Sequence, residues 1–150
     1  MSALCIIPCG SKKIWDADPA AGPTRAKNVY VGPFAGKCRE YALRFYPMSW
    51  CILSAKYGFL FPDDVVPGPY NVTFNDRRTN PISADWLGSH AVEKGLVNYD
   101  EIVVLAGRKY VRLVTQALAG MNVRAPLSGC KGNGYMMQKL KKAMMSGTAL

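Results

Sequence analysis

Three stretches of this sequence place glycine, serine and lysine directly after an apolar run, a pattern typical of loops that contact anions. The first is PCGSKK, residues 8–13. Glycine lets the backbone approach a ligand closely, serine offers a hydroxyl, and the lysines add positive charge. The second glycine and the Gly-Lys-Ser/Thr order of a Walker loop are absent. This stretch predicts a phosphate or nucleic-acid contact, or else a plain turn that ends a strand. The candidate contacts are Cys9, Gly10, Ser11, Lys12 and Lys13.

The second stretch, CILSAKYGFLFPDD at residues 51–64, ends its apolar run in a serine, a lysine and a tyrosine. If Lys56 leaves a parallel sheet at its carboxyl edge, its amine points into the ligand crevice, where loss of water lowers a lysine pKa. Such an amine suits imine chemistry or phosphate binding. The alternative is a lysine that extends past Tyr57 into solvent. We favour a phosphate or transition-state role over an imine, because no second cation or apolar cage is evident beside Lys56.

The same loop continues to PGPYNVTFN, residues 67–75. Tyr70 offers a stacking face next to the amide of Asn71, which both donates and accepts hydrogen bonds, and this pairing suits the edge of a nucleobase. A structural turn held by Tyr70 is the alternative. An aspartate of the region could orient water for hydrolysis. The loop supplies the predicted catalytic residues Lys56, Asn71 and Asp63 and the predicted base-binding residues Ser54, Tyr57 and Tyr70.

The third stretch is APLSGCKGNGYMMQKL, residues 125–140. Its glycines fall between a predicted strand and a predicted helix, so free backbone N–H groups should point at an anion near the helix start. Lys131 adds charge there. The alternative is a helix start with flexible glycines and nothing bound. The predicted phosphate contacts are Ser128, Gly129, Lys131, Gly132 and Gly134.

The elements that carry these loops follow from four short apolar runs, beginning at Ala3, Ser49, Glu101 and Asn122. None alternates with polar residues, which is typical of parallel strands covered on both faces. Helical patterns lie between them. The sequence predicts one domain over residues 1–150, a three-layer α/β/α sandwich with a short, mostly parallel four-stranded sheet. Two proline-containing segments, 16–28 and 61–81, read as long irregular loops.

Net charge, apolar runs and cysteine content indicate which partners and which cellular compartment to expect. The 150 residues include 19 Lys and Arg against 10 Asp and Glu, a net charge of +9 that attracts polyanions such as DNA. No apolar run is long enough to cross a membrane, and the N-terminus lacks the pattern of a signal peptide. Five cysteines without a CxxC pair predict a reduced, cytoplasmic protein. His90 has no ligand-spaced partner, so we expect no metal and no cofactor; the oligomeric state stays open.

At IIPCGSKK, LSAKYGFL with PYNVTF, and PLSGCKG, the sequence resembles the YaaA-like family. That resemblance implies binding to DNA and a uracil-DNA-glycosylase-like α/β fold. RAPLSGCKGNG stands where uracil-DNA glycosylases carry an HPSPLS loop, but position 125 is alanine, not the catalytic histidine. The water-activating DPYH segment is also absent after the first strand. The resemblance therefore implies the fold more than the chemistry.

Three functions are compatible with these observations. The leading hypothesis is an enzyme that acts on a nucleobase in DNA by cleaving an N-glycosidic bond, in the manner of a DNA glycosylase in repair. The second is a non-catalytic, YaaA-like DNA-binding stress protein, which explains the charge without a catalytic pair. The third is an enzyme that modifies a deazapurine or a nucleotide. A deep pocket beside Lys56 and Asn71 would favour an enzyme over a flat basic face.

Overall fold

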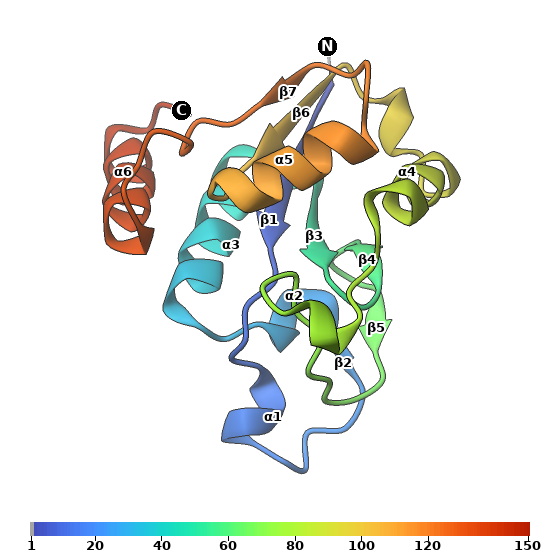
Figure 1. Ribbon diagram of the computed structural model, residues 1–150. Coiled ribbons are helices and arrows are strands. Elements are labelled where there is room, and N and C mark those ends of the chain that lie inside the picture. Colours follow the sequence, from blue (N-terminus) through green and yellow to red (C-terminus); the bar gives the residue numbers. More distant parts are fainter. Residues whose placement is uncertain (1) are drawn as a thin grey trace.

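A five-stranded sheet in the order β4-β3-β1-β6-β7 forms the centre of the protein (Figure 1). The structure is a computed structural model and describes residues 2–150. β1 (Ala3–Pro8) pairs in parallel with β3 (Trp50–Ser54) and β6 (Glu101–Val104), and β7 (Val123–Arg124) pairs in parallel with β6. β4 (Gly58–Leu60) is antiparallel to β3.

The four strands expected from the sequence are all present, but the expected count of four is wrong. The fifth strand, β4, follows β3 after a three-residue turn, and its register pairs Ser54 with Gly58 and Leu53 with Phe59. Only three residues long, β4 had no apolar run of its own in the sequence. The confirmed description is a mixed α/β fold around a mostly parallel sheet.

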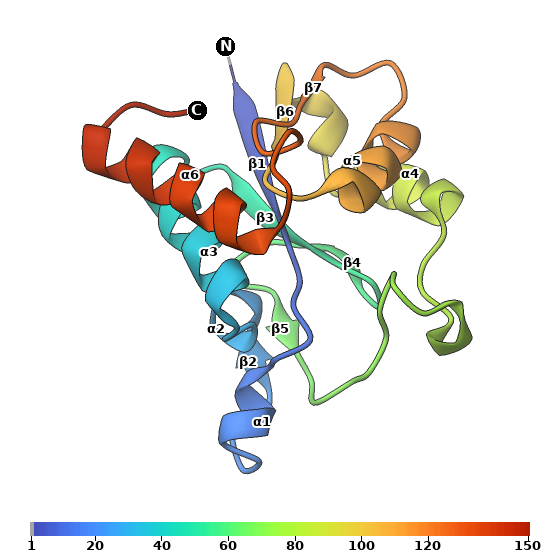
Figure 2. The same ribbon diagram turned by 60° about the vertical axis from the view of Figure 1, so that its left-hand side comes forward.

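Helices cover both faces of this sheet (Figure 2). α3 (Pro33–Phe45) and α6 (Asn133–Ser146) pack together on one face, and α4 (Ala84–Glu93) and α5 (Arg108–Ala117) pack together on the other. Each overlaps a helical pattern of the sequence. Pro33 stands at the first turn of α3, where its missing N–H costs nothing.

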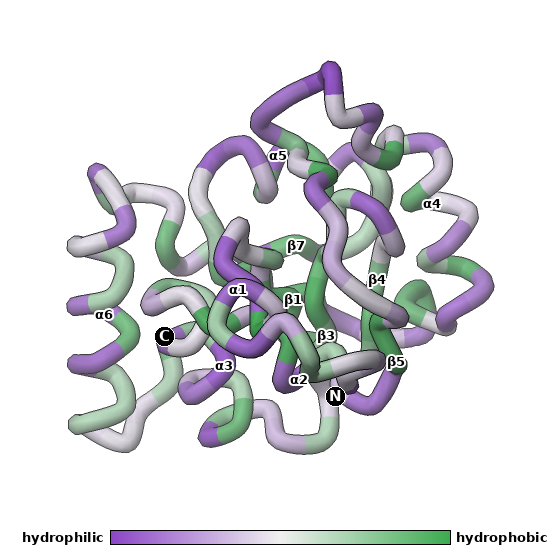
Figure 3. Tube along the Cα trace, turned by 90° about the horizontal axis from the view of Figure 1, so that it is seen from below, coloured by the Kyte–Doolittle hydropathy of each residue, from purple (hydrophilic) through white to green (hydrophobic). Residues whose placement is uncertain are grey.

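Each face of the sheet has its own hydrophobic core. Along β1, Cys5 and Ile7 belong to the cluster under α3 and α6, whereas Leu4 and Ile6 belong to the cluster under α4 and α5. Burial on both sides explains why the strand is continuously apolar. Figure 3 shows β1 and β3 in the green of hydrophobic residues.

The proline-containing segments are more ordered than the sequence indicated. The first of them overlaps the one-turn helices α1 (Ile14–Ala17) and α2 (Ala26–Val29). The two segments also contribute β2 (Thr24–Arg25) and β5 (Val65–Val66), which pair in an antiparallel two-stranded sheet. Two 3-10 turns complete the described elements, at Arg77–Thr79 and Leu96–Asn98. Within residues 2–150, no helix has the length and apolar character needed to cross a membrane.

The turn between β3 and β4 depends on Gly58, whose φ is +79°. A Cβ atom there would lie 2.5 Å from Nδ1 of His90 and 2.7 Å from Cζ3 of Trp86. His90 cannot move freely, because its Nδ1 accepts a hydrogen bond from the Phe59 N–H at 3.2 Å. Glycine at this position therefore serves both backbone conformation and close packing.

We predict that Gly58→Ala lowers the free energy of unfolding by about 2–5 kcal/mol, the sum of left-handed strain and overpacking. Urea denaturation measures this change in the free energy of unfolding. Gly22→Ala is the matched control, since Gly22 has φ +67° but nothing within 4 Å of the added Cβ. That variant should lose only the strain, about 1–2 kcal/mol. Equal losses in the two variants would show that His90 and Trp86 do not confine this turn.

Candidate functional site

A cavity of about 890 Å³ opens at the carboxyl ends of β1 and β6. The two strands are neighbours, but the chain leaves β1 toward α3 on one face and leaves β6 toward α5 on the other. Their loops diverge, and a crevice at such a switch in direction is the usual ligand site of an open α/β sheet. Its volume suits a ligand of nucleotide size.

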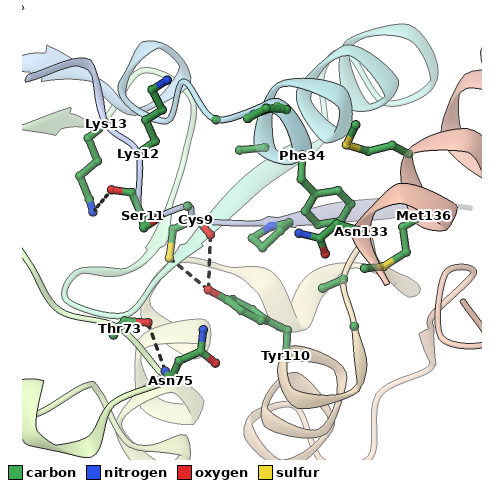
Figure 4. A pocket seen from close by; sticks show the side chains of 18 of the residues that line it. Cys9, Ser11, Lys12, Lys13, Phe34, Thr73, Asn75, Tyr110, Asn133 and Met136 are labelled. Atoms are coloured by element: carbon green, nitrogen blue, oxygen red, sulfur yellow. Dashed lines mark hydrogen bonds between the residues drawn. The ribbon is translucent and has the colours of Figure 1, made fainter. Parts of the chain in front are cut away.

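Five segments from different parts of the sequence line this cavity (Figure 4). They are the loop after β1, the start of α3, the loop before the Arg77–Thr79 turn, and the starts of α5 and α6. The lining consists of Pro8, Cys9, Gly10, Ser11, Lys12, Lys13, Gly32, Pro33, Phe34, Ala35, Asn71, Val72, Thr73, Asn75, Ala106, Gly107, Tyr110, Asn133, Gly134, Met136 and Met137. Over residues 2–150, no Asp, Glu or His is part of it.

The loop after β1 provides the cationic wall. All five residues predicted there line the cavity, Lys12 exposed and Lys13 only 7% exposed. Nζ of Lys13 donates a 3.4 Å hydrogen bond to the Ser11 carbonyl oxygen and lies 4.5 Å from the centroid of the Tyr70 ring. Burial lowers the pKa of Lys13, while nearby Cys9 and Asp16 act in the opposite direction.

Aromatic and amide side chains form the remaining walls. In the view of Figure 4, the Asn133 amide lies between the rings of Phe34 and Tyr110. The Tyr110 hydroxyl is 3.2 Å from Sγ of Cys9, and burial raises the pKa of Tyr110, so this phenol stays protonated at neutral pH. Asn75 accepts a 3.3 Å hydrogen bond from Lys109, which ties its loop to α5.

Ser54 and Tyr70 form a buried hydrogen-bond network behind the cationic wall. The Ser54 hydroxyl lies 2.9 Å from the Tyr70 hydroxyl, which also bonds the Tyr30 hydroxyl. Ser54 Oγ accepts from the N–H groups of Lys56 and Tyr57, at 3.3 and 3.1 Å. Burial raises the pKa of Tyr70 to about 12, so the phenol stays neutral. The LSAKYG stretch is therefore a turn held by a buried serine.

Ser54→Ala should lower the free energy of unfolding by about 1–3 kcal/mol, because the partly buried N–H groups of Lys56 and Tyr57 lose their acceptor. Urea denaturation checks this. Ser89→Ala, at an exposed position of α4, should change stability by less than about 0.5 kcal/mol. If the two alanine variants were equally stable, the network would contribute nothing to the fold.

The other residues predicted from this loop are dispersed. Lys56 is exposed, with Nζ 5.3 Å from the centroid of the Tyr57 ring and 5.7 Å from that of Tyr70. Neither Lys56 nor Tyr57 lines the cavity, but Asn71 does. Asp63 lies beyond β4, where its carboxylate pairs with Arg25 at 3.3 Å and Lys27 at 3.0 Å. Lys27 lowers the pKa of Asp63.

The glycine-rich loop before α6 divides between two surfaces. Gly134 lines the cavity, together with Asn133. Gly129 and Lys131 line a second, smaller pocket of about 410 Å³, with Tyr135, Lys139 and Lys142 among its other residues. Gly132 precedes the first residue of α6 with φ +147°, and Ser128 is exposed in the turn after β7. The loop thus connects the cavity to an outer basic surface.

Sequence reasoning missed Phe34, Thr73, Asn75, Tyr110 and Asn133 as lining residues. A signal existed for Tyr110, which follows β6 as closely as the first basic loop follows β1. The positions of the other four residues depend on how helices and loops pack around the carboxyl ends of β1 and β6.

Comparison with known proteins corrects the family. Residues 4–142 match the model of a family described as "Family of unknown function (DUF6884)". The chain is 49% identical over 146 residues to "Uncharacterized protein YfjM" of Bacillus subtilis (strain 168), covering 96% of each chain. No solved structure gives a significant match. The resemblance to the YaaA-like family, and with it the uracil-DNA-glycosylase-like fold, was therefore wrong: it depended on short loop motifs, whereas the family match spans most of the chain.

Proposed function

Because this chain belongs to the DUF6884 family, whose function is unknown, we propose a function from the chemistry of the cavity itself. The protein is an enzyme that acts on a nucleobase in DNA and cleaves its N-glycosidic bond. The observation that supports this proposal is that a single cavity combines a cationic loop with aromatic and amide side chains. This cavity lies where the chain leaves β1 and β6 toward opposite faces of the sheet.

The two walls suit the two ends of a nucleotide unit. Lys12 supplies charge for a phosphate, and the glycine of the same loop allows close approach. Phe34 and Tyr110 supply rings against which a base can stack, and Asn71, Asn75 and Asn133 can donate to and accept from its edge. A flipped base would occupy the aromatic end while its phosphate remains at the loop.

Binding to DNA is supported by the charge around the cavity. Arg108 and Lys109 begin α5 beside Gly107, and Lys131 lies on the loop that leads to Gly134 at the start of α6. With a net charge of +9, the protein has the excess of cations that phosphate contacts require.

The test is a panel of oligonucleotides that each carry one damaged or modified base. Base release is measured by mass spectrometry of the products, and binding by fluorescence anisotropy of the same strands. We expect release of at least one kind of base and tighter binding of that strand than of its unmodified match. Binding without release from any strand would favour the non-catalytic DNA-binding function. Equal affinity for nucleotides and for deoxyribose phosphate would contradict recognition of a base.

A further inference from the structure

Lys13 is buried in a way that lysines rarely are. Only 7% of it is exposed, although a lysine this deeply buried normally has a carboxylate partner. Within residues 2–150, no Asp or Glu lies within ion-pair distance of its amine. Its contacts are the Ser11 carbonyl oxygen and the face of Tyr70.

Lys94 provides a comparison within the same protein. Its side chain is 26% exposed and its Nζ lies 4.8 Å from the centroid of the Phe61 ring, much as Lys13 lies against Tyr70. Lys94 also pairs with Asp64 at 2.7 Å, so its charge is balanced. Lys13 differs in lacking such a partner and in lining the cavity.

The main chain around Lys13 keeps its side chain directed inward. The Lys13 N–H donates a 2.8 Å hydrogen bond to Asp16, closing the start of α1. Lys13 also forms an isolated β-bridge with Tyr30, and the Val31 N–H donates to the Lys12 carbonyl oxygen at 3.1 Å. Because the backbone is held on both sides, the Lys13 amine stays next to Ser11 and Tyr70, at the wall of the cavity.

Burial in this environment lowers the pKa of Lys13. Desolvation disfavours the ammonium form, and the groups facing Lys13 are Cys9, Asp16, Tyr30, Tyr70 and the neighbouring cation Lys56, which lies against the same Tyr70 ring. Of these, Cys9 and Asp16 oppose the shift. In a cavity lined by no carboxylate or imidazole, a lysine amine with a lowered pKa and no ion-pair partner is the group best suited to form an imine.

We propose that Lys13, rather than Lys56, is the amine nucleophile of this cavity and forms an imine with C1′ of the sugar. The proposal rests on the proposed function for its substrate. The Nζ lone pair attacks C1′, the C–N bond forms, and the base leaves with the electron pair of the glycosidic bond and takes up a proton. The C1′–O4′ bond then breaks, O4′ keeps its electron pair and takes up the second Nζ proton, and the opened sugar remains bound as the imine. With a sugar that is already an open aldehyde, the same amine forms the imine with loss of one water.

The test uses two probes, pyridoxal phosphate and an oligonucleotide with one abasic site, each reduced with borohydride. Hydride reduces the imine to a stable secondary amine, and peptide mass spectrometry locates it. We expect Lys13 to be the main labelled residue with both probes, and the peptides that contain Lys56 and Lys94 to remain nearly unlabelled. Lys13→Arg should abolish labelling at this site, because a guanidinium replaces the amine nucleophile.

The two probes separate the two proposals. Labelling spread over exposed lysines such as Lys56, or full trapping of the abasic strand by Lys13→Arg, would overturn the role of Lys13. Labelling of Lys13 by pyridoxal phosphate without any binding or trapping of DNA would support the amine and overturn the DNA substrate. Base release that persists in Lys13→Arg at the rate of the parent would leave the proposed function standing and refute the nucleophile. A thermal melt of Lys13→Arg establishes that the variant is folded.

Discussion

Gly107→Trp is expected to abolish binding of nucleotide-sized ligands while the protein remains folded. Gly107 lines the cavity at the start of α5, and a Cβ atom added there meets nothing within 4 Å. Its φ of −78° is available to any residue. The indole therefore has room to enter, but only by occupying the space in which a ligand would lie.

The measurement is titration of the parent and of Gly107→Trp with the same oligonucleotide or nucleotide. Gly68→Trp is the matched control: Gly68 also has nothing within 4 Å of an added Cβ, and it does not line the cavity. The control should bind like the parent. Undiminished binding by Gly107→Trp would mean that the ligand binds elsewhere, such as on the basic pocket beside α6.

The parallel sheet could be predicted because its strands are buried on both faces and read as uninterrupted apolar runs. β1, for example, contributes Leu4 and Cys5 to opposite cores. β4, β2 and β5 are only two or three residues long and were not predicted, whereas the equally short β7 was found because it lies in the longer run that begins at Asn122. They depend on tertiary contacts such as the hydrogen bond from the Ala26 N–H to the Asp64 carbonyl oxygen.

The loops of the site could be predicted, but the direction of their side chains could not. Lys13 and Lys56 both follow apolar strands and look alike in sequence. The bridge to Tyr30 turns Lys13 inward, whereas the tight turn closed by Ser54 leaves Lys56 exposed. Asp63 was expected near the chemistry because it is close in sequence to Lys56, yet β4 carries it to a surface ion pair with Lys27.

Binding of a DNA single strand is expected to weaken by roughly 50-fold when monovalent salt rises about fourfold, if four phosphates are contacted. The physical reason is counterion release by cations around the cavity. Lys12, Arg108 and Lys131 are exposed, and across residues 2–150 none of them forms an ion pair. Their charge is therefore available to phosphates, and the contact should be insensitive to base sequence.

Lys131→Ala isolates one of these contacts. It should weaken binding of every strand by a similar factor and reduce the slope of log affinity against log salt by about 0.7. Arg78→Ala is the control, because the Arg78 guanidinium is already bonded to Asp76 through two nitrogens, each at 3.0 Å. That variant should keep the slope of the parent. An affinity that stays flat with salt would contradict phosphate binding altogether, and a loss in Lys131→Ala confined to one sequence would instead make Lys131 a base contact.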